Sequence, residues 1–296
     1  MKLLYASDLH GLPQRFEGVS AAAEAVRPDA IVLGGDLFAD EASLAPDRAG
    51  RQQPEYVRGS FQLWLERMLA AHPSVEIGVV FGNHDWITSV AETEKLAERL
   101  PLVILDGWSR TDDATPSNGQ PGVHWIGLRW IGYSFTPPTP WHVKDFELLD
   151  QPDDSMPEWD GYQWDAELGR AVKREVASIF GPRRTLAGDL RRLTSPNEPW
   201  ILVAHCPPFD CALDRLEDGK PYGSRAVRRV IEQHHPFLGL HGHFHGSPDF
   251  TGRHVEHIGQ TQSVNVGQPH SGAATAVIDL DEHEGLVRRI DRRVTS

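Results

Sequence analysis

Five short apolar runs in this chain end abruptly in glycine, aspartate, asparagine or histidine. They span Lys2–Ser7, Asp29–Asp36, Val75–Asp85, Pro199–Pro208 and Phe237–His245. Their lengths and boundaries are typical of buried β-strands. Helix-like segments separate the first three runs, at Phe16–Arg27 and Glu55–His72. This β-α-β-α-β order predicts an α/β fold, in which helices pack on a mostly parallel sheet.

The stretch from about residue 107 to 165 interrupts this pattern. It is rich in Pro, Gly and Asp, and it holds six of the nine tryptophans. Since a linker would not carry so many aromatic side chains, we expect an ordered insertion within a single domain spanning residues 1–296. Within the insertion we expect a strand over Val123–Phe135. After it we expect helices over Ala166–Phe180 and Ser224–His234, and closing antiparallel strands near the C-terminus.

The net charge of −13 argues against a general nucleic-acid binder or a membrane-surface binder, which usually carry a basic excess. A nucleotide held locally is not excluded. Two cysteines, Cys206 and Cys211, favour reduced thiols in a cytoplasmic protein. The N-terminal apolar run is too short for a signal peptide, and no stretch approaches the length of a membrane span. We therefore expect a cytoplasmic protein without membrane contact; its oligomeric state is open.

Polar side chains follow each of the five runs. They are Asp8 and His10, then Asp36, then Asn83, His84 and Asp85, then His205, and finally His243 and His245. Because ligands bind outside the carboxyl ends of strands in open α/β sheets, these side chains should converge. Carboxylate, amide and imidazole groups suit Mn, Fe, Zn or Co without a thiolate. A shared carboxylate can hold two ions about 3.5–4 Å apart, so the pattern predicts a two-metal site.

These short motifs, "DLH", "GGD", "GNHD", "AH" and "GHFH", resemble the motif set of the calcineurin-like metallophosphoesterase superfamily, in the same order. The resemblance spans Asp8 to His245 and implies an αββα sandwich, two mixed sheets flanked by helices, with a dinuclear metal centre. It implies a first metal held by Asp8, His10 and His245, a second held by Asn83, His205 and His243, and Asp36 bridging both.

The same resemblance implies that His84 faces the substrate rather than a metal, where it stabilises the transition state or protonates the leaving oxygen. Asp85 would orient His84 through a hydrogen bond to its other ring nitrogen. A metal-bridging hydroxide would attack phosphorus in line. The favoured cofactor is a pair of Mn²⁺ ions, with Fe, Zn, Co or Ni as alternatives.

The chain departs from the protein serine/threonine phosphatases, because no arginine-bearing motif follows "GDLFAD" and no clamping arginine follows "GNH". It looks closer to the bacterial phosphodiesterase-type branch. We expect a metal-dependent phosphoesterase acting on a small phosphorylated substrate, such as a nucleotide-like one, with a diester favoured over a monoester. The alternative is a catalytically inactive scaffold or binding module with the same fold.

Other residues have two interpretations each. His241 is a structural histidine or, with Trp86 and Arg129, a substrate contact; we favour the structural role for His241. The tryptophan-rich insertion is a small core of its own or a cap whose aromatic faces bind substrate, and the core is favoured. Arg129 and Lys144 lie within it and could reach a phosphate, although charged residues of this kind are usually only solvated.

Overall fold

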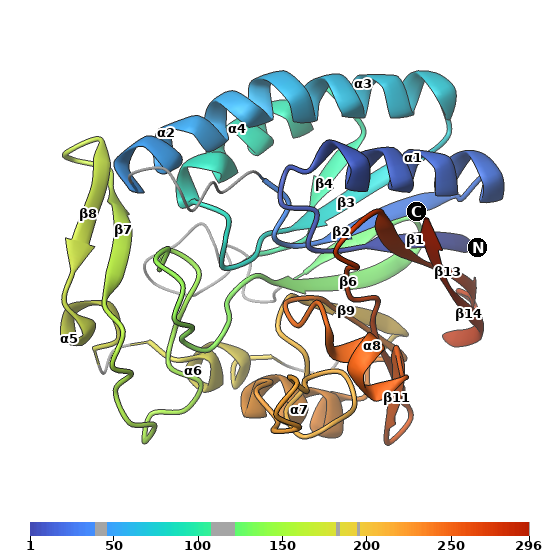
Figure 1. Ribbon diagram of the computed structural model, residues 1–296. Helices are drawn as coiled ribbons and strands as arrows, with labels where there is room; N and C mark the ends of the chain where they lie inside the picture. Colours follow the sequence, from blue (N-terminus) through green and yellow to red (C-terminus); the bar gives the residue numbers. More distant parts are fainter. Residues whose placement is uncertain (39–45, 108–121, 182–183, 194–195, 296) are drawn as a thin grey trace.

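The computed structural model describes residues 1–38, 46–107, 122–181, 184–193 and 196–295. Two six-stranded sheets form its centre (Figure 1). The first has the order β14 (Leu286–Thr295), β13 (Ala273–Asp281), β1 (Lys2–Ala6), β2 (Ala30–Gly34), β3 (Glu76–Val80) and β4 (Leu102–Ile104). The second has the order β11 (Val255–Ile258), β12 (Thr261–Asn265), β10 (Leu238–His241), β9 (Trp200–Ala204), β6 (Leu128–Tyr133) and β5 (Val123–Trp125).

Helices cover the outer face of each sheet. Over the first sheet lie α1 (Pro13–Val26), α2 (Pro46–Tyr56), the π-turn η1 (Val57–Phe61), α3 (Gln62–Ala71) and α4 (Ile87–Ala97). Next to the second sheet lie α6 (Leu186–Leu190), α7 (Arg225–His234) and α8 (Ser247–Thr251). This is the αββα sandwich expected from the sequence. No helix in the described part of the chain is both long and apolar enough to cross a membrane.

The strands that carry the site run parallel. β1 to β4 are parallel in the first sheet, and β6, β9, β10 and β12 are parallel in the second. The antiparallel strands lie at the edges: β13 and β14 in the first sheet, β11 and β5 in the second. The carboxyl ends of β1, β2 and β3 therefore share one edge, as do those of β9 and β10.

The alternation of side chains along β1 shows how the layers pack. Leu3 and Tyr5 are buried between the two sheets, whereas Leu4 and Ala6 are buried against the helices. The Tyr5 hydroxyl donates a 2.7 Å hydrogen bond to the carbonyl of His241, which joins the two sheets. A Cβ at Gly34 would lie 2.1 Å from that hydroxyl, so only glycine leaves room for it.

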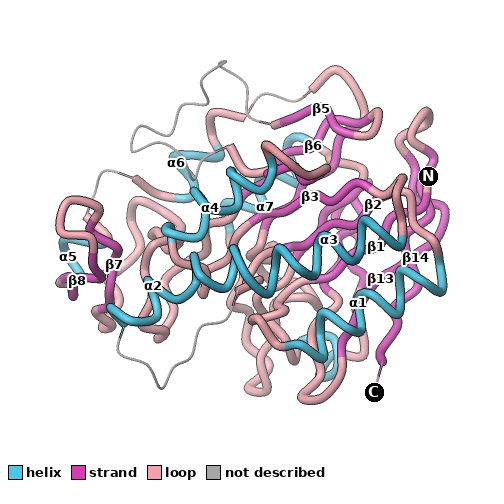
Figure 2. The backbone as a smooth tube through the Cα atoms, turned by 90° about the horizontal axis from the view of Figure 1, so that it is seen from above, coloured by secondary structure: helices cyan, strands magenta, loops and turns pink. Residues whose placement is uncertain are grey.

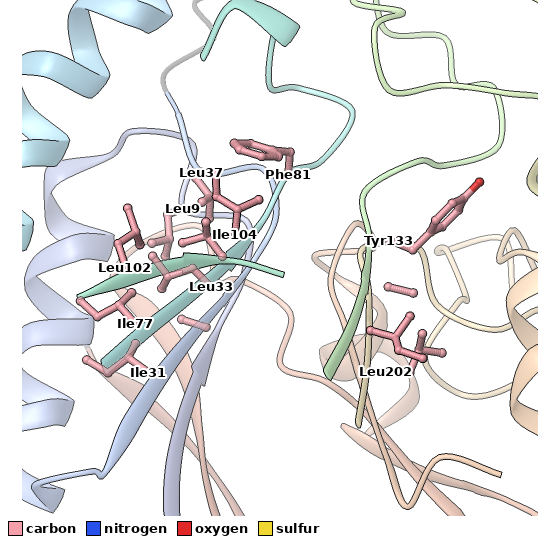
Figure 3. Packing of buried hydrophobic residues seen from close by; sticks show 14 of the residues in the cluster. Leu9, Ile31, Leu33, Leu37, Ile77, Phe81, Leu102, Ile104, Tyr133 and Leu202 are labelled. Atoms are coloured by element: carbon pink, nitrogen blue, oxygen red, sulfur yellow. The ribbon is translucent and has the colours of Figure 1, made fainter. Parts of the chain in front are cut away.

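The outer faces of the two sheets hold the remaining core. In Figure 3, Ile31, Ile77 and Leu102 project side by side from neighbouring strands of the first sheet, while Tyr133 and Leu202 project from the second. All five side chains are buried. Each sheet is thus apolar on both faces, which explains why its parallel strands appear in the sequence as continuous apolar runs.

The predicted helix over Ala166–Phe180 is wrong. The chain forms a two-stranded hairpin, β7 (Gly161–Asp165) and β8 (Arg170–Arg174), followed by the short helix α5 (Val176–Ile179). Gly169 has a φ of +60° in the connecting turn, where Asp165 accepts a hydrogen bond from the Leu168 N–H. This turn and the packing of the hairpin beside α2 override the helix propensity of the segment (Figure 2).

Three other predicted elements differ from the structure in their bounds. The predicted strand over Val123–Phe135 is a hairpin of β5 and β6, because Ile126 and Gly127 both have positive φ and form a tight turn. The strand predicted over Phe237–His245 corresponds to β10 and stops at His241. His243 therefore lies in the following loop, with a φ of +69°. The helix predicted over Glu55–His72 corresponds to the end of α2, η1 and α3.

Candidate metal centre

Five loops at the carboxyl ends of five strands deliver the candidate ligands. The loops after β1, β2 and β3 come from the first sheet, and those after β9 and β10 come from the second. Backbone hydrogen bonds tie the first two loops together, from Asp8 N–H to the Gly35 carbonyl at 2.9 Å and from His10 N–H to the Asp36 carbonyl at 2.8 Å. The Gly242 N–H likewise bonds the His205 carbonyl at 2.9 Å. The ligand loops are therefore fixed by main-chain contacts.

The backbone of this site is locally strained. Four candidate ligands have a left-handed φ: Asp8 (59°), His10 (50°), Asp36 (51°) and His243 (69°). Non-glycine residues rarely adopt this conformation, and such residues cluster at functional sites. The hydrogen bonds described above hold these four residues in this conformation. Their side chains therefore point in other directions than they would if each strand continued in an extended conformation.

The structure brings the predicted ligands into two groups. In the first, Asp8, His10, Asp36 and His245 offer ligand atoms that all lie within 4.8 Å of one another. In the second, Asp36, His205 and His243 do the same. Asp36 belongs to both groups, as a bridging carboxylate must.

A buried polar atom beside the second group, Asn83 Oδ1, has no hydrogen-bond partner in the described residues. His205 Nε2 makes no regular hydrogen bond there either and lies 3.3 Å from Asp36 Oδ2. The Asn83 loop touches the group, since a Cβ at Gly82 would lie 2.2 Å from Asp36 Oδ1 and 2.6 Å from His205 Nε2. An unpartnered buried acceptor is costly unless something binds it. The donor set therefore fits divalent cations.

The electrostatics of the site also favour bound cations. Burial lowers the pKa of both His10 and His243 to about 3, so both imidazoles are neutral and keep a lone pair for a metal. Burial alone would raise the pKa of Asp36, but nearby His205 holds it well below its ordinary value. Burial would likewise lower the pKa of His205, yet the charge of Asp36 outweighs it and raises that pKa to about 9. The carboxylates attract positive charge strongly.

Comparison with known proteins agrees with this geometry. The family model for calcineurin-like phosphoesterases matches residues 1–247. The chain belongs to the calcineurin-like phosphoesterase family. No curated protein matches it.

Two solved structures show the same fold at low sequence identity. One crystal structure has a TM-score of 0.61 and 18% identity, covering 100% of this chain and 99% of the other. The protein TT1561 of Thermus thermophilus has a TM-score of 0.55 and 17% identity, covering 99% and 98%. A structure described as a novel archaeal phosphodiesterase is more distant, with a TM-score of 0.43 and 10% identity over 100% of both chains.

The contacts of Asp85 differ from the role expected for it in this phosphoesterase. Among the described residues, its carboxylate accepts hydrogen bonds from backbone N–H groups of two loops. Leu37 and Phe38 donate at 3.0–3.2 Å, and Gly82 donates at 2.9 Å. Burial, reinforced by the charge of Asp36, raises the pKa of Asp85 to about 7. Asp85 is a brace between the β2 and β3 loops, because three converging N–H groups occupy both of its oxygens.

His84 lies beside the two ligand groups without joining either. Its N–H donates to Asp36 Oδ1 at 2.8 Å, and its ring meets the His10 ring edge-on at 4.8 Å. The other neighbour is Trp141 from the insertion, whose ring stacks on His84 with a centroid distance of 4.4 Å and an interplanar angle of 26°. Gln53 of α2 donates to the His84 carbonyl at 2.8 Å.

Sequence reasoning did not single out Trp141 or Gln53. Gln53 had no signal, since a glutamine in an amphipathic helix is ordinary. Trp141 belonged to the tryptophan-rich insertion, but nothing local distinguished it from its neighbours. Part of the insertion packs in a small cluster that includes Trp141, whereas Trp125 and Trp130 pack between the two sheets. Trp141 also stacks on His84, and a substrate-binding role for the insertion stays a prediction.

The other candidate substrate contacts lie elsewhere. Trp86 is fully buried in a cluster with Val143 and Ala171, so it cannot meet a substrate. Arg129 pairs in register with Trp200 at the start of β9, which places it toward the edge opposite the site. The structure therefore places neither of these two candidates at the ligand groups. Lys144 is buried too, in an ion pair with Glu147 at 2.8 Å.

His241 lies at the end of β10, just before the ligand loop. It is fully buried, with Nδ1 2.9 Å from the Ala204 carbonyl and Nε2 3.4 Å from Ser263 Oγ. Both ring nitrogens are thus directed at β9 and β12 rather than at the ligand groups. The structural role favoured from the sequence matches this placement.

Proposed function

We propose that this member of the family is a dinuclear metal-dependent phosphohydrolase that cleaves a phosphodiester. The observation that carries the proposal is the position of Asp36, whose carboxylate belongs to both ligand groups. Asp8, His10 and His245 complete one side, and Asn83, His205 and His243 complete the other. Two divalent ions, Mn²⁺ by preference, supply the Lewis acidity that activates water and neutralises phosphate charge.

The residues of the chain have separate tasks in this proposal. The strained loops hold the ligand atoms in place, and Asp85 keeps the Asp36 and Asn83 loops together. The ring of His84 lies next to His10 but holds no metal, so it is placed to donate a proton to the leaving oxygen. Trp141 covers one face of that ring and limits its rotation.

The substrate and the location in the cell are also proposals. A small nucleotide-like diester is compatible with the acidic chain only where bound cations offset the carboxylates, as they would beside Asp36 and Asp8. Both thiols, Cys206 and Cys211, are buried and unpaired, which supports a reducing cytoplasm.

Metal analysis combined with hydrolysis of p-nitrophenyl mono- and diesters tests this function. The Mn²⁺-loaded protein is expected to bind two ions per chain and to cleave the diester faster. Asp36→Asn should lose at least one ion and about 10³-fold in kcat/KM, since metal stabilisation of the transition state is worth several kcal/mol. Asp153→Asn, which alters an exposed aspartate, is the matched control.

Two results would argue against the proposal. Full metal content with no cleavage of either ester would leave an inactive binding module. Unchanged activity in Asp36→Asn would mean that the two ligand groups do not share a working centre.

A further inference from the structure

A cavity of about 840 Å³ opens beside the metal centre on the side of His245. His10 separates it from the Trp141 side, because the His10 ring lies 4.8 Å from His84 and 4.9 Å from His245. Other residues on its wall include Arg15, Leu216, Tyr222, Phe250 and His270. The centre thus has two different flanks, and only one is covered by the insertion.

Apolar side chains gather on this cavity although they remain open to solvent. Leu216 and Tyr222 are each 42% exposed, and Phe250 is 50% exposed. Large apolar side chains grouped around a concave site, with polar groups among them, are typical of a ligand pocket rather than of packing. The volume is within the range that holds a drug-sized or nucleoside-sized ligand.

The loop that carries Tyr222 is fixed by hydrogen bonds to a buried carboxylate. Asp214 is fully buried and accepts the N–H groups of Asp210, Cys211 and Gly223 at 2.9–3.1 Å, which closes the loop that carries Tyr222. The Tyr222 hydroxyl donates to Asp218 at 2.7 Å. A pre-ordered wall loses little entropy when a ligand binds.

The helix that carries Phe250 is fastened to the same loop. Ser247 at the start of α8 donates to the Ala212 carbonyl at 2.9 Å and accepts the Arg215 N–H at 3.1 Å. Tyr222 and Phe250 therefore belong to one connected wall.

Arg15 supplies a positive charge next to the metal centre, while the acidic residues of the lining are Glu217, Asp218 and Asp249. Arg15 of α1 is only 8% exposed, and its guanidinium donates to the carbonyl of the candidate ligand Asp8 at 2.6 Å and to the Pro269 carbonyl at 3.3 Å. A positive charge between the metal centre and the aromatic wall favours a ligand that carries its anionic group inward and its ring outward.

We propose that this cavity binds the non-leaving substituent of the substrate, and that this substituent is a nucleoside with a planar base against Tyr222 and Phe250. The assignment rests on the proposed function for its reaction. The leaving oxygen lies at His84, so the group that stays on phosphorus extends past His10 toward His245. Aromatic faces bind any base by stacking, so the site selects a nucleoside rather than one particular base.

Two diesters with the same leaving group test the proposal, thymidine 5′-(p-nitrophenyl phosphate) and methyl p-nitrophenyl phosphate. The Mn²⁺-loaded protein should prefer the thymidine ester by at least about tenfold in kcat/KM, the effect of one good stacking contact. In the double variant Tyr222→Ala/Phe250→Ala this preference should fall about tenfold. Leu168→Ala removes an exposed apolar side chain (58%) on the β7–β8 turn, outside the cavity, and should keep the preference.

Calorimetric titration with thymidine 5′-monophosphate gives a second measurement that needs no turnover. The double variant should bind it about tenfold more weakly than Leu168→Ala, with an unchanged melting temperature. Equal affinity in the two variants, or an ester preference that survives in the double variant, would overturn the proposal. If no ester is cleaved but binding still depends on Tyr222 and Phe250, the nucleoside site stands and the proposed hydrolysis fails.

Discussion

The metal centre and the insertion are each held by a buried carboxylate, but the two carboxylates are neutralised differently. Glu147 accepts the backbone N–H and the hydroxyl of Thr139, and it pairs with Lys144 Nζ at 2.8 Å. Among the described residues, the hydrogen bonds that reach Asp85 all come from backbone N–H groups. The carboxylate of the insertion is paired with a lysine, whereas Asp85 of the metal centre receives only backbone N–H groups from the described residues.

This difference indicates where each region gets its stability. Burial raises the pKa of Glu147 to about 7, although Lys144 opposes the shift, and burial with Asp36 raises that of Asp85 to a similar value. Asp8, Asp36 and Asp85 are all buried within the metal centre. Bound cations would balance these three, so removal of metal should loosen the ligand loops and leave the insertion intact.

The largest effect is expected from Asp85→Ala, which removes the brace of the metal centre. Three buried N–H groups lose their acceptor, each at about 1–3 kcal/mol, so the free energy of unfolding should fall by about 5 kcal/mol. Metal content should fall with it, because the Asp36 and Asn83 loops come apart. Denaturant unfolding and metal analysis measure the two effects. A variant as stable as the wild type that loses only activity would restore the His84-orienting role.

The next effect concerns the insertion alone. Lys144→Met leaves Glu147 buried without its cation, which should lower the free energy of unfolding by about 3 kcal/mol. Lys144→Met/Glu147→Gln should recover most of the loss, because a neutral amide still accepts the bonds from Thr139. Metal stoichiometry should stay at the wild-type value in both variants. Metal loss in Lys144→Met would show that the two regions do not differ as described.

The sequence predicted the metal centre better than the insertion for a physical reason. Strand ends in a parallel sheet converge whatever the loops contain, so the positions of Asp36 and His205 followed from the order of the runs. The partners of Asp85 could not be predicted in this way, because no sequence pattern shows which side chain the backbone N–H groups of Leu37 and Phe38 will contact. The same holds for Lys144, whose burial depends on the fold of the whole insertion.

The hairpin β7–β8 illustrates the same limit in the fold. Ala166–Phe180 is composed of good helix formers, and only Gly169 signals the turn. Trp164 packs beside Gly50 of α2, where a Cβ would lie 3.0 Å from the indole. Tertiary packing of this kind decides between strand and helix, and one chain segment alone does not reveal it.

A smaller, pH-dependent effect tests the junction between the two regions. Asp145 of the insertion accepts the N–H groups of Ile87, at the start of α4, and of Trp164 at 2.9–3.0 Å. Burial raises its pKa from 3.8 to about 6. The folded state therefore binds this proton more tightly than the unfolded state does. The contribution of Asp145 to the free energy of unfolding is thus lost as pH rises from 3.8 to about 6.

Asp145→Asn cannot ionise, so it lacks that pH dependence. The unfolding free energy of the wild type minus that of the variant should fall by about 2 kcal/mol as pH rises between those values, at about 1.4 kcal/mol for each pKa unit. Denaturant unfolding at a series of pH values measures it. A constant difference would mean that Asp145 titrates alike in both states.

The smallest effect is expected where the two regions touch, at Trp141. An aromatic pair contributes about 1 kcal/mol, so Trp141→Ala should lower kcat about fivefold by freeing the His84 ring, while metal content stays unchanged. Trp141→Phe keeps a flat face over His84 and should restore most of the rate. If kcat is unchanged and KM rises instead, Trp141 contacts the substrate rather than positioning His84. Lys144 bonds the Thr139 carbonyl, and the Thr139 hydroxyl accepts the Trp141 N–H, so these two residues hold the loop that carries Trp141. Lys144→Met should therefore lower kcat by the same factor. Adding Trp141→Ala to Lys144→Met should lower kcat little further.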